Sequence, residues 1–157
     1  MHIKTKIVMA LIKSISGFRG TIGGKTNDGL TPIDTVKFVS AFAAFIKETY
    51  NKEKITIVLG RDARVSGEMV SHLVVGTLMG MGVDVIDTGL STTPTVEVAV
   101  TEKKADAGII LTASHNPMQW NALKFLNAKG EFISASEGKR VLELAASEDF
   151  LFAEVDK

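Results

Sequence analysis

The chain contains no cysteine among its 157 residues. Disulfide bonds, thiolate catalysis and cysteine-based zinc sites are therefore excluded, and the composition is compatible with a reducing compartment. Charge of either sign is also not in excess, because 18 basic and 18 acidic side chains cancel. No global positive field would attract nucleic acid or anionic lipid, so any anion site has to be local. We therefore expect no nucleic-acid partner and no membrane association.

A long hydrophobic run is missing from the N-terminal end. The uninterrupted apolar stretch Ile7–Ile12 is followed by Lys13 and by no small-residue cleavage site. It is shorter than the ~7–15 apolar residues of a signal peptide and far shorter than a membrane span. Residues 1–10 are interpreted as a loose leader that runs into a first strand over residues 3–12, and we expect a cytoplasmic protein.

Internal repeats, low-complexity segments and nucleotide-binding fingerprints are absent too. Gly23-Gly24 and Gly80-Met81-Gly82 lack the Gly-x-Gly-x-x-Gly spacing between a strand and a helix. A generic dinucleotide-binding domain is therefore disfavoured. Hydrophobic residues make up 45% of the chain and charged residues 23%, which is ordinary for one globular domain with a proper core.

Strands and helices alternate along the sequence. Helix starts are predicted from capping residues and from proline at the first helical position, and strands from short β-branched runs. The predicted helices begin at Thr31-Pro32, Ser66, Pro94 and the Ser134/Glu137 capping box, and the predicted core strands are 55–59, 83–86 and 107–111. On the second of these helices, one face is expected to carry Met69, Leu73, Gly76 and Gly80. A hairpin turn at residues 127–130 would add an antiparallel edge. We predict an α/β fold with three α/β/α layers, in which helices cover both faces of a mainly parallel mixed sheet.

The most informative stretch is Thr112-Ala113-Ser114-His115-Asn116-Pro117, which directly follows the apolar run Gly108–Leu111. Pro117 ends strand pairing and biases Asn116 toward extended backbone, which exposes the loop. Open α/β sheets place their chemistry at the carboxyl ends of strands. Taken alone, Ser114 would be interpreted as a serine that turns a loop at the end of a strand.

This hexapeptide resembles the active-site loop of the α-D-phosphohexomutases, the phosphoglucomutase/phosphomannomutase family. The resemblance continues into Asn121-Ala122-Leu123-Lys124, where the family usually has Asn-Gly-x-Lys, so that alanine replaces the glycine. Ser16-Gly17-Phe18-Arg19-Gly20 is similar to the family's Ser-Gly-Ile-Arg-Gly. Gly60-Arg61-Asp62-Ala63-Arg64-Val65-Ser66 is similar to its Gly-Arg-Asp-x-Arg-x-Ser. Three motifs in the family's order are far more specific than a serine beside a histidine.

The resemblance implies that residues 11–147 form domain I of a phosphohexomutase and that residues 148–157 lead toward a second domain. The complete protein would interconvert hexose 1-phosphates and 6-phosphates through a phosphorylated Ser114 and a hexose bisphosphate intermediate, which also serves as activator. Mg²⁺ is the implied cofactor, with the phosphate on Ser114 as one ligand and the other ligands in domains outside this chain. The isolated chain is expected to be inactive. The sugar stays open between glucose, mannose and glucosamine.

Roles for individual side chains follow from the resemblance. His115 would position the phosphoryl group or the sugar hydroxyl, Lys124 would stabilise charge or move a proton, and Arg19 would offer a bidentate contact to phosphate. Asp62 is expected to pair with a neighbouring arginine, and the residues alone do not decide whether Arg61 or Arg64 faces the site. The predicted catalytic residues are Ser114, His115, Lys124 and Arg19, and the predicted phosphate or substrate contacts are Asn116, Arg61 and Asn121.

A non-catalytic alternative remains at this point. The same loop could belong to a module that binds a phosphosugar or a partner without turning it over. Continuation of the reading frame into a loop of alternating aspartates would favour the mutase.

Overall fold

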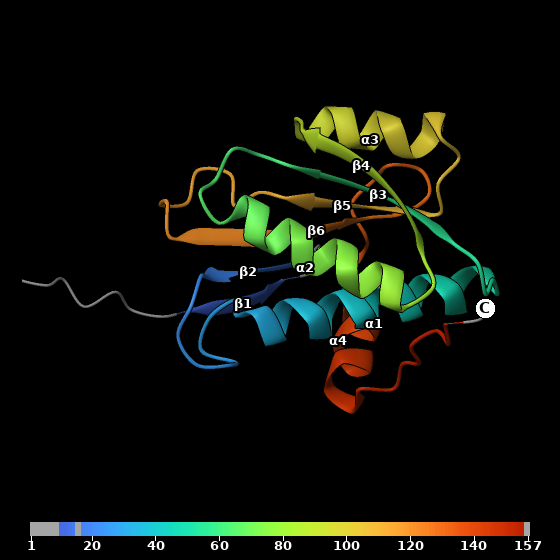
Figure 1. The fold of residues 1–157 in the computed structure, drawn as a ribbon, viewed down its shortest axis with the longest axis horizontal. Helices are drawn as coiled ribbons and strands as arrows, with labels where there is room; N and C mark the ends of the chain where they lie inside the picture. The colour runs from blue at the N-terminus through green and yellow to red at the C-terminus, as the bar shows by residue number, and fades with distance from the viewer. Residues whose placement is uncertain (1–9, 15–16, 156–157) are drawn as a thin grey trace, which may run out of the picture.

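The computed structural model describes residues 10–14 and 17–155, and within them it shows one six-stranded sheet and four helices (Figure 1). The strands are β1 (Leu11–Ser14), β2 (Gly17–Thr21), β3 (Thr56–Arg61), β4 (Asp84–Leu90), β5 (Ala107–Leu111) and β6 (Trp120–Leu126). The helices are α1 (Pro32–Tyr50), α2 (Gly67–Gly80), α3 (Thr93–Glu102) and α4 (Ala135–Ser147). None of the helices in the described ranges is long and apolar enough to cross a membrane.

The sheet is mixed, with the strand order β1-β2-β6-β5-β3-β4. β3 pairs in parallel with β4 and with β5, while the β1–β2, β2–β6 and β5–β6 pairs are antiparallel. The α/β class and the mixed sheet predicted from the sequence are confirmed. The antiparallel part is larger than the single hairpin edge that we predicted, because β2 pairs with the outer side of β6 and brings β1 with it.

Helices cover both faces of the sheet, as predicted. α1, α2 and α4 lie on one face and α3 lies on the other (Figure 1). Alternation along β3 supplies both cores: Ile57 and Leu59 join the large core, whereas Val58 joins the smaller cluster under α3. Because β3 and β5 are parallel neighbours, their carboxyl ends lie at the same edge of the sheet, between the two helix layers.

Local capping explains where most helices begin. Thr31 and Ser134 each form a capping box with the residue three positions on, and the Thr92 side chain accepts a hydrogen bond from the Thr95 amide. The predicted starts of α1, α3 and α4 are thus confirmed. Ser66 occupies the N-cap position of α2, but its side chain makes no capping hydrogen bond, so the predicted capping role is wrong.

Two further expectations need correction. On α2 the sequence placed Met69 and Leu73 on one face with two glycines, but the buried stripe lies one position on, at Val70, Val74 and Leu78. Branched side chains fill this core better than glycine does. The predicted core strand 83–86 is the sheet edge β4, which is only partly buried because it pairs with β3 alone.

More of the C-terminal end of the chain is described than of its N-terminal end. The predicted leader, Ser16 and most of the predicted first strand over residues 3–12 lie outside the described residues, and β1 begins at Leu11. After α4, Phe150 packs against the large core and meets Phe152 edge to face, and the Ala153 amide donates to the Gly80 carbonyl at 2.8 Å. Phe150 and Phe152 therefore have partners that the sequence did not show, whereas Leu151 is exposed. The boundary at 148 stays a prediction.

Candidate active site

Ser114 lies in the segment that joins β5 to β6, just beyond the carboxyl end of the fully buried strand β5. We call residues 112–120, which run to the first residue of β6, the serine loop. Its side chain is exposed, and its backbone has φ 53°, a left-handed conformation that residues other than glycine seldom adopt. The Ser114 amide donates to Thr112 Oγ1 at 3.1 Å, and Ser114 Oγ lies 3.5 Å from His115 Nδ1. The loop thus presents the serine hydroxyl and the imidazole to solvent side by side.

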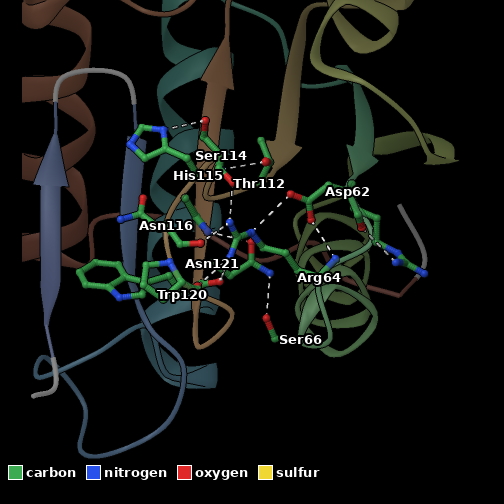
Figure 2. Close-up of polar contacts among 12 residues, drawn as sticks. Asp62, Arg64, Ser66, Thr112, Ser114, His115, Asn116, Trp120 and Asn121 are labelled. Carbon is green, nitrogen blue, oxygen red and sulfur yellow. Dashed lines mark hydrogen bonds and ion pairs between the residues drawn. The ribbon is translucent and has the colours of Figure 1, made fainter. Parts of the chain in front are cut away.

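The guanidinium of Arg64 holds this loop from below, as Figure 2 shows. Nη2 donates to the carbonyls of Ser114 and Asn116, at 2.6 Å and 2.8 Å. Nη1 donates to the carbonyls of Pro117 and Trp120, at 2.9 Å and 3.0 Å. The Arg64 side chain is only 11% exposed. One side chain from the loop after β3 therefore fixes the backbone of the serine loop at four points.

Asp62 orients Arg64. Its Oδ2 lies 3.4 Å from Arg64 Nε, its Oδ1 accepts a hydrogen bond from the Arg64 amide at 3.0 Å, and its own amide donates to the Leu111 carbonyl at 3.1 Å. The predicted pairing of Asp62 with a neighbouring arginine is confirmed, and the structure identifies that arginine as Arg64. The aspartate also joins its loop directly to the end of β5.

Arg61 lies elsewhere. Its Nη1 donates to the Asp62 carbonyl at 3.3 Å, and the side chain passes beside Gly67, at the start of α2. Among the described residues it makes no hydrogen bond to the serine loop. The phosphate contact predicted for Arg61 stays a prediction. Of the two arginines between which the sequence did not decide, Arg64 is the one that contacts the serine loop.

Asn121 connects the same two loops deeper in the protein. Its side chain is fully buried, Nδ2 donates to Ser66 Oγ at 3.0 Å, and Oδ1 accepts from the Ala122 amide at 2.8 Å. Ser66 is therefore engaged with the start of β6 instead of capping α2 (Figure 2). The Asn121 side chain is enclosed by the protein and bonded to it. The predicted contact between Asn121 and substrate stays a prediction.

Arg19 and Lys124 lie on neighbouring strands. Arg19 on β2 pairs with Ala122, and Lys124 lies two residues further along β6, so both side chains belong to the same face of the sheet. Arg19 Nη1 lies 3.5 Å from Asn116 Oδ1, which brings it to the serine loop. Lys124 Nζ lies 6.0 Å from the Phe132 ring centroid and makes no hydrogen bond to that loop within the described part of the chain. Of the predicted site residues, His115, Asn116 and Arg19 thus lie together at the serine loop. Lys124 shares the sheet face of Arg19 without bonding to that loop among the described residues.

Metal ligands do not gather in the same way. Residues 10–14 and 17–155 contain no group of three or more His, Asp or Glu side chains that could hold a metal ion. The described residues therefore do not fit a magnesium site by themselves.

Comparison with known proteins agrees with this geometry. The family model described as phosphoglucomutase/phosphomannomutase, alpha/beta/alpha domain I, matches residues 11–152. The chain belongs to the phosphoglucomutase/phosphomannomutase family. Its match is to the first domain of that family, which contains the Ser114 loop.

Similar proteins carry related names. A phosphoglucomutase/phosphomannomutase from Thermococcus kodakarensis is 39% identical over 83% of this chain and 29% of its own length. A phosphoglucosamine mutase from Macrococcus caseolyticus is also 39% identical, over 84% of this chain and 30% of its own length. A solved structure of a protein provisionally named phosphomannomutase, from Thermus thermophilus, has a TM-score of 0.76 and 31% identity, and the match covers 86% of this chain and 30% of that one. The chain thus spans about three tenths of the length of the curated relatives that it matches.

Proposed function

We propose that this chain is the phosphoserine domain of a phosphohexomutase that interconverts hexose 1-phosphates and 6-phosphates. The observation that carries the proposal is the exposed Ser114 hydroxyl at the carboxyl end of β5, on a loop whose backbone is fixed by Arg64. A serine phosphate ester is stable at neutral pH, so it can persist until a sugar binds. It becomes reactive when positioned charges stabilise the transferring group.

The reaction would proceed in two phosphoryl transfers in opposite directions, first from Ser114 to the sugar and then from the sugar to Ser114. In the first, the bond between phosphorus and Ser114 Oγ breaks while a bond forms to a sugar hydroxyl. The proton of that hydroxyl passes to a base, and the serine oxygen is reprotonated. The sugar is then a bisphosphate. After it reorients, its other phosphoryl group returns to Ser114, and the isomeric monophosphate leaves.

Several side chains support these transfers. His115 lies beside Ser114 Oγ and is placed to hydrogen-bond the phosphoryl group or the sugar hydroxyl. Arg19 reaches Asn116 on the same loop, so a phosphate on the serine would meet a guanidinium there. Lys124 shares the face of Arg19 and would add positive charge or move a proton.

Magnesium enters the proposal only as an expectation of the family. The phosphate on Ser114 is the single ligand that this chain would supply, and the described residues hold no metal cluster. When bound, the ion would neutralise charge on the transferring phosphoryl group.

The substrate is proposed as a class. Relatives named for glucose, mannose and glucosamine phosphates resemble this chain to similar degrees, and the part that would select between these sugars is proposed to lie in the remaining domains.

The test uses the complete protein. Intact-mass and peptide analysis of the active enzyme should find one phosphate on Ser114, and Ser114→Ala should abolish turnover of the three candidate hexose 1-phosphates. Because the serine is exposed, the substitution should change the free energy of unfolding by no more than about 0.5 kcal/mol. Ser136→Ala, at an exposed serine on α4, is the matched control and should stay active. A fully active Ser114→Ala variant would disprove the nucleophile, and sugar binding without phosphate or turnover would favour the non-catalytic module.

A further inference from the structure

Arg64 is the best-connected polar side chain near Ser114, and the proposed reaction assigns it no step. We infer that Arg64, oriented by Asp62, is a positioning residue that sets the geometry of the Ser114 loop for phosphoryl transfer and does not bind substrate. This inference rests on the proposed function, because it concerns the same serine.

The hydrogen-bond inventory of the guanidinium carries the first step. An arginine side chain has five N–H donors and no acceptor. Four carbonyl oxygens of the serine loop accept bonds from Nη1 and Nη2. Nε faces the Asp62 carboxylate at 3.4 Å. Nη1 and Nη2 are thus each bonded to two carbonyl oxygens. Nε is buried and makes no hydrogen bond, but it is ion-paired with Asp62. Little of the guanidinium is therefore left for the phosphate of an incoming sugar.

Burial supports the same conclusion. The Arg64 side chain is 11% exposed, whereas Ser114 and Arg19 are exposed at the surface of the same site. A buried guanidinium that is already paired is poorly placed to capture an anion from solvent. Arg19 has the opposite character, because over residues 10–14 and 17–155 its side chain makes a single hydrogen bond, the long 3.5 Å contact with Asn116 Oδ1.

The conformation that Arg64 holds is one that the loop would seldom adopt unaided. Ser114 has φ 53°, and Arg64 Nη2 bonds to its carbonyl at 2.6 Å. Releasing this carbonyl would let the backbone return to commoner conformations and would turn the hydroxyl. Displacing a reacting group by about 1 Å can cost about 10²-fold in rate.

Further contacts make the two loops one rigid unit. The Asp62 amide bonds to the Leu111 carbonyl, and the buried Asn121 amide bonds to Ser66 Oγ. Asp62, Arg64 and Ser66, the three polar residues at alternate positions of this loop, all act on the serine loop or its flanking strands. The Gly60–Ser66 motif therefore supports the Ser114 motif across the carboxyl ends of β3 and β5.

The experiment compares variants of the full-length protein. Arg64→Lys keeps the charge but cannot span four carbonyls, and Asp62→Asn removes the ionic partner of Nε while keeping the oxygen that accepts from the Arg64 amide. Arg140→Lys is the matched control, since Arg140 is a partly exposed arginine whose partners, Glu48 and Glu143, lie on α1 and α4 and not in the serine loop. For each variant, kcat and KM, phosphate occupancy of Ser114, the ³¹P chemical shift of the phosphoserine and the melting temperature are measured.

We expect Arg64→Lys to lower kcat by about 10²-fold and to shift the ³¹P resonance, with KM changed by less than about threefold. Asp62→Asn should act in the same direction by about tenfold, and it keeps the test decisive if Arg64→Lys folds poorly. Arg140→Lys should match the wild type within about twofold, because exposed ion pairs contribute little.

Two other outcomes would overturn the inference alone. One is wild-type kcat and ³¹P shift in both loop variants below their melting temperatures. The other is a raised KM at unchanged kcat, which would make Arg64 a substrate-binding residue. A wild-type enzyme with neither phosphoserine nor turnover would overturn the proposed function itself, and the inference with it, before any variant is considered.

Discussion

Ser114, Arg19 and Lys124 come from three adjacent strands of the sheet and differ in how tightly the fold holds them. Ser114 follows β5 and is fixed through its backbone, whereas Arg19 on β2 makes one side-chain hydrogen bond within the described residues, the long one to Asn116. Lys124 on β6 lies near the Phe132 ring and, in the part of the chain that the structure describes, makes no hydrogen bond to the serine loop. The fold therefore fixes the proposed nucleophile and leaves the two cations room to meet a phosphate.

Neutralising or reshaping either cation should slow phosphoryl transfer more than it weakens the fold. We expect Lys124→Met and Arg19→Lys in the full-length enzyme to lower kcat by about 10²–10³-fold, since each removes a positioned charge or its bidentate fork. Thermal melting should stay close to the wild type, because neither side chain has an ion pair among the described residues to lose. Lys129→Met, at an exposed lysine of the hairpin turn, is the control. Wild-type kcat in both cation variants would make them ordinary surface charges.

The sequence predicted the exposed Ser114-His115 pair because a buried strand followed by a proline-limited loop is a local pattern. It could not choose between Arg61 and Arg64, since both flank Asp62 and the choice depends on which one reaches carbonyls about fifty residues later. Asp62, Arg64 and Ser66 lie in the loop and turn between β3 and α2. The alternation of a strand does not fix side-chain directions there, so their spacing could not identify the arginine that contacts the serine loop. Burial of Asn121 had no signal in the sequence either.

At the scale of elements, β2 decides how Arg19 is presented. Phe18 is buried and stacks on Phe38 with ring centroids 3.7 Å apart, so its neighbour Arg19 projects from the opposite face of the strand. Gly17 has φ +149°, and a Cβ there would lie 1.9 Å from the Leu123 carbonyl oxygen of β6. Gly17 of the Ser16–Gly20 motif thus allows β2 and β6 to approach each other closely.

Gly17→Ala should separate β2 from β6 and destabilise the domain. The added Cβ collides with backbone, which cannot move aside as a side chain could, so we expect a loss of more than about 2 kcal/mol in urea unfolding. Gly76→Ala is a matched control of opposite sign. Gly76 is an exposed residue of α2 with open space around it, and alanine there should stabilise by roughly 0.5–1 kcal/mol. Equal stability of the two variants would contradict this account of the β2–β6 contact.

Helices were predicted better than strands for a physical reason. Caps such as Thr31 and the Ser134/Glu137 box act within four residues, so their effect is visible in the sequence. β2 has two glycines in five residues and no clear alternation, and it is held as a strand between β1 and β6, the second of which lies about a hundred residues away. β4 was placed in the core because its apolar residues do not reveal that one of its edges is unpaired.

At the scale of the whole molecule, the predicted α/β layers follow from alternation of helices and strands, but the strand order does not. The parallel unit β5-β3-β4 and the antiparallel unit β1-β2-β6 meet at the β5–β6 pair, and the serine loop connects these two strands. Ser114 therefore lies at the boundary between the two halves of the sheet. Arg64 reaches it from the parallel half and Arg19 from the antiparallel half.

This arrangement predicts different behaviour for folding and for catalysis when residues 1–157 are studied alone. The large core unites both halves of the sheet with three helices, so the chain should fold and unfold cooperatively, as measured by circular dichroism during urea titration. Turnover should be negligible, because the chain spans about three tenths of its curated relatives and the described residues hold no metal cluster. The full-length protein is the control, assayed with the same hexose 1-phosphates. Robust turnover by residues 1–157 would mean that the Ser114 loop is sufficient for the chemistry, and would contradict the proposal that other domains supply the metal and the sugar contacts.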